Sequence, residues 1–141
     1  KMKYKRSFNI GTIRLLKNQV EETVWDEMKE AIKQNIKSNG AKVAIGSGGN
    51  INKVFSLSKK KEGKPLNLEL LKDYYKELSS FSIEERIRLY KLRSDRADVI
   101  VPALQIYINI MRWADIDLIY VPKIGLADGL IQKLYQEIIS R

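Results

Sequence analysis

A mostly apolar stretch at residues 95–113 limits the fold more than any other part of the sequence. Its spacing predicts one long helix with apolar side chains on nearly all sides: Val99, Ile100, Val101, Leu104, Ile106, Ile108, Ile110 and Met111. Such a helix has no polar face for water, so other elements must cover most of its surface. Pro102 is expected to kink the helix or to lie within its first turns, where the missing N–H costs little. The chain must therefore fold as layers around this helix.

The remaining segments alternate between strand and helix patterns. Strands are expected at 4–16, 42–45 and 116–121, and helices at 20–36, 51–57, 68–78, 82–89 and 125–140. Ser82 and Glu85 have the spacing of a capping box at a helix start. This order predicts a helix-rich α/β domain with parallel strands and right-handed crossovers. There is no repeat and no second domain, and residues 59–65 form an internal loop.

The composition excludes several classes of chemistry. The 141 residues include 26 Lys and Arg, 17 Asp and Glu, and neither His nor Cys. This excludes Ser-His-Asp and Cys-His nucleophile systems, disulfides and zinc sites of the usual Cys/His type. Any metal would need oxygen ligands, as Mg²⁺ or Mn²⁺ does. No apolar run reaches the roughly 18 residues of a membrane span, and the basic start does not resemble a signal peptide. The lack of cysteine is compatible with a reducing cytoplasm, where we expect the protein.

The formal net charge of +9 has two interpretations. One is a lysine-rich solvated surface, and the other is a polyanionic partner such as a phosphate chain, a nucleotide or nucleic acid. The densest basic cluster is Lys59, Lys60, Lys61 and Lys64. It flanks Gly63 and Pro65, which favours a loop over a rigid reading surface. Aromatic residues are not interleaved with basic ones, as stacking on bases requires, so nucleic acid is the less favoured partner.

Residues Gly46, Ser47, Gly48, Gly49 and Asn50 follow an expected strand and open an expected helix. Glycine lets the backbone approach an anion, and a helix N-terminus presents free N–H groups with partial positive charge. The run lacks the Gly-Lys-Ser/Thr ending of a Walker loop and the third glycine of the dinucleotide fingerprint. It therefore predicts either a phosphate site or a tight turn without a ligand.

A second candidate lies where a loop enters the long helix. Arg93 and Arg96 could hold a phosphate through charge-assisted hydrogen bonds. The alternative is that Ser94 or Asp95 caps the helix while Arg96 pairs with Asp98 or another neighbour.

Two further segments carry possible functional residues. Arg14, within residues 11–15, could reach an anion, although a surface ion pair explains it equally well. The run Gly125-Leu126-Ala127-Asp128-Gly129 follows the last expected strand, and helix capping accounts for it.

Together, the segments at 7–15, 46–50, 92–100 and 125–129 resemble the exopolyphosphatase / guanosine pentaphosphate phosphohydrolase (Ppx/GppA) family in order and spacing. The resemblance spans nearly the whole chain, and the Asp-Arg-Ala-Asp-Val-Ile stretch is its most specific part. It implies an actin-like, ribonuclease H-like fold of two similar domains with the active site in the cleft between them. Residues 1–141 resemble only part of the second domain, without its Asp-x-Gly-Gly-Gly-Ser loop. The first residue is Lys rather than Met, so we expect a piece of a longer parent, truncated at its N-terminus.

The resemblance also implies a function. Family members release the terminal phosphate of inorganic polyphosphate, or the 5′-terminal phosphate of guanosine pentaphosphate, usually with Mg²⁺. The glutamate that activates water belongs to the first domain, so this chain is expected to hold no catalytic residue and no metal ligand, and to be inactive alone. It would supply one wall of the phosphate-binding cleft. The residues carried over to that wall are Gly46, Ser47, Gly48, Gly49, Arg96, the neighbouring Arg93 and Arg14.

Other functions and partners stay open at this point. The main rival to a hydrolase acting by direct water attack is a non-catalytic module that binds polyphosphate or a guanosine alarmone. The expected partners are the substrate and the missing N-terminal domain. A sheet without its first strands would have open edges, so a homodimer is also possible.

Overall fold

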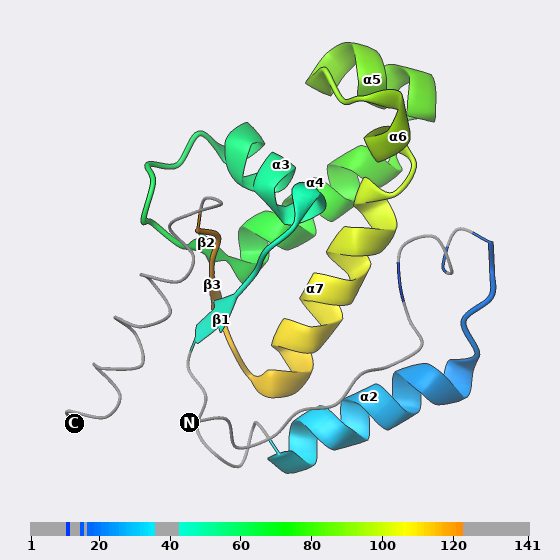
Figure 1. Ribbon diagram of the computed structural model, residues 1–141, viewed down its shortest axis with the longest axis vertical. Helices are drawn as coiled ribbons and strands as arrows, with labels where there is room; N and C mark the ends of the chain where they lie inside the picture. The colour runs from blue at the N-terminus through cyan, green and yellow to red at the C-terminus, as the bar shows by residue number, and fades with distance from the viewer. Residues whose placement is uncertain (1–10, 12–14, 16, 36–42, 123–141) are drawn as a thin grey trace.

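The computed structural model describes residues 11, 15, 17–35 and 43–122. The expected strand at 4–16, apart from Gly11 and Leu15, and the expected helix at 125–140 lie outside these residues. In the described part, a small mixed sheet lies at one side of a group of helices (Figure 1). The structure is therefore a helix-rich α/β fold, as the sequence predicts.

Helix α7 (Ile100–Ala114) runs through the middle of the described structure (Figure 1). Its buried residues are Ile100, Pro102, Ala103, Leu104, Ile108, Met111 and Ala114. Helices α2 (Glu22–Asn35), α3 (Gly49–Ser58) and α4 (Leu68–Ser79) all pack against it. The expectation that this helix is covered on most sides is confirmed.

The predicted helix at 95–113 is wrong in one respect, because it is two helices. Helix α6 (Ser94–Ala97) is a single turn, and α7 begins only at Ile100. Pro102 has no N–H to donate to the carbonyl of Asp98, and its ring would clash with that carbonyl in a continuous helix. The chain therefore breaks at Asp98 and Val99, and Pro102 lies in the first turn of α7, which is one of the two expected outcomes.

Contacts on α2 and α4 hold these helices in place. Met28, Ala31 and Ile32 of α2 are buried, and Trp25 meets Trp113 of α7 edge to face with ring centroids 6.0 Å apart. This geometry is favourable for aromatic pairs. Helix α4 buries Leu71 and Leu78, and Asn67 caps its start by accepting a hydrogen bond from the Leu70 N–H at 2.8 Å.

The sheet has the strand order β1-β3-β2. Strands β1 (Val43–Ile45) and β3 (Leu118–Tyr120) are parallel, with Val43 opposite Leu118. Strand β2 (Leu66–Asn67) pairs antiparallel with β3. The expectation of an all-parallel sheet is wrong, because β2 was not foreseen: two residues are too short to show an alternating pattern.

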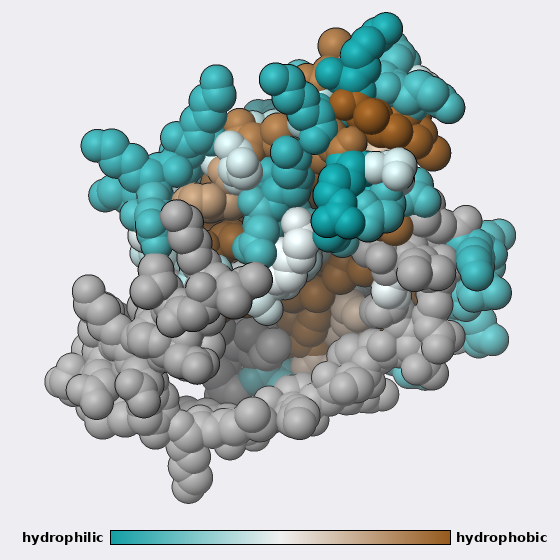
Figure 2. Space-filling view, turned by 45° about the horizontal axis from the view of Figure 1, so that its top comes forward, coloured by the Kyte–Doolittle hydropathy of each residue, from teal (hydrophilic) through white to brown (hydrophobic). Residues whose placement is uncertain are grey.

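The outer surface agrees with the basic, charged composition. Hydrophilic side chains cover most of the described part of the face in Figure 2, with apolar side chains between them. The loop between α3 and β2 holds Lys59, Lys60, Lys61 and Lys64, all exposed. Within the described residues, no helix is both long and apolar enough to cross a membrane.

The predicted capping box opens helix α5 (Ile83–Tyr90). The Ser82 N–H donates to Glu85 Oε1 at 2.9 Å, and the Glu85 N–H donates to Ser82 Oγ at 3.2 Å. Hydrogen bonds from the backbone and side chain of Ser82 lower the pKa of Glu85 below its usual value of about 4.5. The charged carboxylate is therefore the form that the fold stabilises.

This lowered pKa predicts an acid-dependent loss of stability. Because the pKa of Glu85 is lower in the folded state, its contribution is present above about pH 4.5 and is lost as the pH falls through the lowered value. Glu85→Gln keeps a capping group but removes this titration. Urea unfolding between about pH 3 and pH 7 should show a shallower loss of stability at low pH in the variant. Parallel pH profiles of the two proteins would contradict this assignment.

Candidate functional site

The glycine-rich bend connects β1 to α3. Gly48 is the N-cap of α3, with φ +115° and ψ 166°, a conformation open in practice to glycine. No side chain caps α3, and no acidic residue lies in its first turn. The start of α3 therefore presents backbone N–H groups that no N-cap side chain occupies.

Gly46 has a different role from Gly48 and Gly49. It is buried, and its N–H donates to the Tyr120 carbonyl at 2.8 Å, which continues the pairing of β1 with β3. A Cβ at Gly46 would lie 2.8 Å from Ile119 Cδ1. The structure thus gives Gly46 a packing role at the sheet and leaves its amide without capacity for a ligand. Ser47 is exposed on the bend.

The half-buried Arg96 of α6 reaches across to the start of α3. Its Nη1 donates to Asn50 Oδ1 at 2.9 Å, and a Cβ at Gly49 would lie 2.6 Å from Arg96 Cζ. A side chain at position 49 would therefore push this guanidinium away. Two segments far apart in the sequence meet here, with the guanidinium beside the first turn of α3.

A tyrosine on α7 lies near the same guanidinium. Burial raises the pKa of Tyr107, and the positive charge of Arg96 opposes this rise. The phenol therefore stays protonated at neutral pH. Among the described residues, no acidic group forms an ion pair with Arg96, so the alternative pairing with Asp98 is not seen.

Arg93 is the N-cap of α6, without a side-chain capping bond. The alternative in which Ser94 or Asp95 caps this helix is therefore wrong. Asp95 instead pairs with Arg93, with 3.1 Å between Asp95 Oδ2 and Arg93 Nη2 and side chains that are 62% and 80% exposed. Exposed pairs of this kind contribute little, so Arg93 can exchange Asp95 for another anion at low cost.

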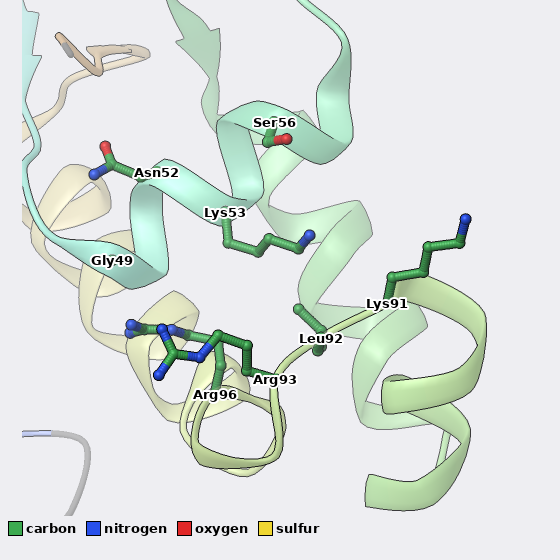
Figure 3. A pocket seen from close by; sticks show the side chains of 8 residues that line it. All are labelled: Gly49, Asn52, Lys53, Ser56, Lys91, Leu92, Arg93 and Arg96. Atoms are coloured by element: carbon green, nitrogen blue, oxygen red, sulfur yellow. The ribbon is translucent and has the colours of Figure 1, made fainter.

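A cavity of about 300 Å³ lies between α3 and the segment that leads into α6. Its lining residues are Gly49, Asn52, Lys53, Ser56, Lys91, Leu92, Arg93 and Arg96. Figure 3 shows the guanidinium groups of Arg93 and Arg96 below the first turn of α3, with Lys53 pointing from α3 towards Leu92 and Lys91 pointing away. Four of the eight residues are cationic and none is acidic, so the cavity suits an anion.

The structure brings together some of the predicted site residues and separates others. Gly49, Arg93 and Arg96 line the cavity, and Gly48 adjoins it, whereas Gly46 belongs to the sheet. Arg14 lies outside the described residues.

The sequence did not indicate that Asn52, Lys53, Ser56 and Lys91 line the cavity, nor that Asn50 is the partner of Arg96. Lys53 follows Gly49 by one helical turn, so helical spacing from the glycine could have indicated it. Lys91 is the C-cap of α5 and has a left-handed backbone conformation, with φ 53°. A lysine at this position does not indicate such a conformation from the sequence.

Alanine substitution of the two neighbouring glycines should have different effects on the free energy of unfolding. Gly48→Ala meets no atom within 4 Å but must adopt the positive φ, so it should cost about 1–3 kcal/mol of stability. Gly49→Ala should change stability by no more than about 1 kcal/mol, because a helical alanine is favourable and one hydrogen bond is lost. It should shift the NMR signals of Arg96 Nε and Asn50 Nδ2. Unchanged signals in Gly49→Ala would show that Arg96 does not lie against this glycine.

The fold is the actin-like α/β domain seen in solved Ppx/GppA structures. A structure of the Aquifex aeolicus PPX-GPPA enzyme aligns with a TM-score of 0.68 at 20% identity, covering 93% of this chain and 49% of that chain. A type II variant of the Aquifex aeolicus Ppx/GppA phosphatase aligns with a TM-score of 0.66 at 19% identity, covering 86% and 46%. This chain thus spans about half the length of these structures.

Sequence comparison defines the family. The model of the Ppx/GppA phosphatase family matches residues 4–137, so the chain belongs to this family. The comparison with curated proteins gives no significant match.

Proposed function

We propose that this chain supplies one wall of the phosphate-binding cleft in a two-domain phosphohydrolase. The substrate would be inorganic polyphosphate or guanosine pentaphosphate, and the reaction would release the terminal phosphate. One observation carries the proposal: the Arg96 guanidinium lies against Gly49 at the uncapped start of α3, in a cavity with four cations and no acid. Membership of the Ppx/GppA phosphatase family and an actin-like fold support it.

The geometry is suited to a phosphate group. A guanidinium carries five N–H donors, and the hydrogen bond to Asn50 uses one nitrogen, Nη1. Asn50 thereby orients the planar guanidinium group of Arg96 and leaves the N–H donors on Nη2 and Nε for phosphate oxygens. The α3 N-terminus adds backbone N–H groups and a partial positive charge. Lys53 and Arg93 add charge around the same cavity.

The chain's part in hydrolysis would be to neutralise charge. Attack of water on a phosphoanhydride also needs a base, and none of the residues lining the cavity is acidic. We place the base on the first domain of the parent and the Asp-x-Gly-Gly-Gly-Ser phosphate loop on the part of the second domain that precedes this chain, and propose direct attack by water without a phosphoenzyme. The 141-residue chain should then bind substrate without cleaving it.

The cavity does not fit Mg²⁺ as a resident ion. Its side-chain oxygen donors are the amide of Asn52 and the hydroxyl of Ser56, and four cationic residues line the same cavity. Mg²⁺ prefers carboxylates, water and substrate phosphates. No group of three or more acidic residues with the geometry of a metal site occurs within the described ranges. No step of the proposal therefore passes through a metal held by these residues.

Titration with tripolyphosphate, a guanosine nucleotide and single-stranded DNA at two salt concentrations tests this function. If the chain has a specific phosphate site, it should still bind tripolyphosphate at about 0.2 M salt. If binding depends only on the net positive charge, the affinity for all three ligands should fall steeply with salt. Equal salt-sensitive binding of the three ligands would contradict the proposal.

The rival function is a regulatory module that binds polyphosphate or an alarmone without cleaving it. The absence of an acid from the cavity lining fits this function equally well. Phosphate release from polyphosphate by the two-domain parent separates the two. Release by the parent supports the hydrolase, and tight binding without release supports the module.

A further inference from the structure

Arg86 on α5 connects three helices. Its Nε donates to the Leu78 carbonyl at 2.8 Å, near the end of α4, and its Nη1 donates to the Ala97 carbonyl at 2.9 Å, at the end of α6. The side chain is partly buried, whereas α5 itself contributes no buried residue. One guanidinium thus links α6 to α4 from a helix on the periphery.

The Ala97 carbonyl needs this donor because of the break between α6 and α7. In a continuous helix it would accept the N–H of Val101, but among the described residues no backbone donor to it is found. Ala97 is fully buried, so water does not replace the missing donor. Arg86 satisfies a carbonyl that Pro102 and the helix break leave outside the regular hydrogen-bond ladder.

Helix α6 is too short to be stable without contacts to other elements. It has four residues, and a single turn gains too little from its own hydrogen bonds to be stable alone. Arg96 directly precedes Ala97, so fixing the Ala97 carbonyl fixes the backbone from which the Arg96 side chain reaches Gly49. An arginine serves here because its planar fork bonds two acceptors at once, which a lysine ammonium does less well.

We propose that Arg86 is a positioning residue for the phosphate site: it holds α6 so that the Arg96 guanidinium stays beside Gly49 and Asn50. This inference rests on the proposed function. Arg86 does not line the cavity and would not touch the anion itself. Its effect on phosphate binding would pass through the Ala97 carbonyl and the α6 backbone.

The test compares Arg86→Met and Arg86→Lys with a matched control, Arg88→Met, an exposed arginine on the same helix. Each variant is examined under conditions where its urea unfolding curve shows a folded protein. Arg86→Met should weaken tripolyphosphate binding at least about tenfold and shift the NMR signals of Arg96 Nε and the Gly49 amide. Arg86→Lys should recover part of the affinity, and Arg88→Met should bind within about twofold of wild type.

The inference is overturned if folded Arg86→Met binds tripolyphosphate like wild type with an unchanged Arg96 signal. In that case Arg86 only stabilises the fold. If Arg86→Met does not fold, Arg86→Lys decides, and wild-type affinity with an unchanged Arg96 signal there also overturns the inference. Arg96→Gln separates this failure from failure of the proposed function. If Arg96→Gln loses tripolyphosphate binding while the Arg86 variants keep it, the proposed phosphate site still stands and only the positioning role of Arg86 is rejected.

Discussion

Arg96→Gln is expected to weaken tripolyphosphate binding by about 10- to 100-fold, because it removes a charge-assisted hydrogen bond worth about 1.5–3 kcal/mol. Glutamine keeps a polar amide at position 96, so loss of the half-buried guanidinium should disturb the surrounding packing little. Isothermal titration calorimetry of the wild-type and variant chains measures the change.

The matched control for this variant is Arg112→Gln. Arg112 is exposed in the last turn of α7, at the end remote from α6 (Figure 1), and does not line the cavity. Both substitutions remove one positive charge, so a general electrostatic effect would change both affinities alike. Arg112→Gln should bind within about twofold of wild type at about 0.15 M salt. Equal losses in the two variants would show that no site is centred on Arg96.

Leu104→Ala is expected to lower the free energy of unfolding by about 2–5 kcal/mol. Leu104 is fully buried on α7, the helix against which α2, α3 and α4 pack. Removing its side chain leaves a cavity where several helices meet, and they cannot all move to fill it. Domains typically have only about 5–15 kcal/mol of stability, so this variant should unfold at much lower urea concentration.

Leu89→Ala is the control for this core substitution. Leu89 lies on α5 and is 51% exposed, so its loss should cost about 0.5 kcal/mol or less. Urea unfolding followed by circular dichroism gives both values. A cost for Leu104→Ala no greater than that for Leu89→Ala would contradict the central place of α7 in the core.

The sequence predicted the core helix because a helix that is covered on most sides has apolar residues around most of its circumference. The same pattern could not show the break at Asp98 and Val99, since apolar residues continue across it. Pro102 indicated that the helix is interrupted or begins nearby. The local sequence does not distinguish a proline that kinks one long helix from a proline in the first turn of a new helix. Strand β2 was missed for another reason: its two residues pair with β3 through tertiary contacts alone.

At the site, local signals led to Gly49 and Arg96 but not to their partners. A glycine run after a strand fits either an anion contact or a plain turn, and an arginine before a helix fits either an anion contact or a local ion pair. The family resemblance favoured the anion contact for both. Gly46 shows the limit of that reasoning, because it packs closely against the Ile119 side chain and its N–H pairs with the Tyr120 carbonyl instead of a ligand. Arg86 could not be found from the sequence, since both of its acceptors are backbone carbonyls that become neighbours only after folding.

The most direct measurement is an NMR titration of the chain with tripolyphosphate, following the backbone amides of Gly49 and Asn50 together with Arg96 Nε. If one anion lies between the α3 N-terminus and the guanidinium, all three signals shift along a single binding curve with one Kd. Movement of the Arg96 signal without the amides, or with a different Kd, would contradict the shared phosphate site.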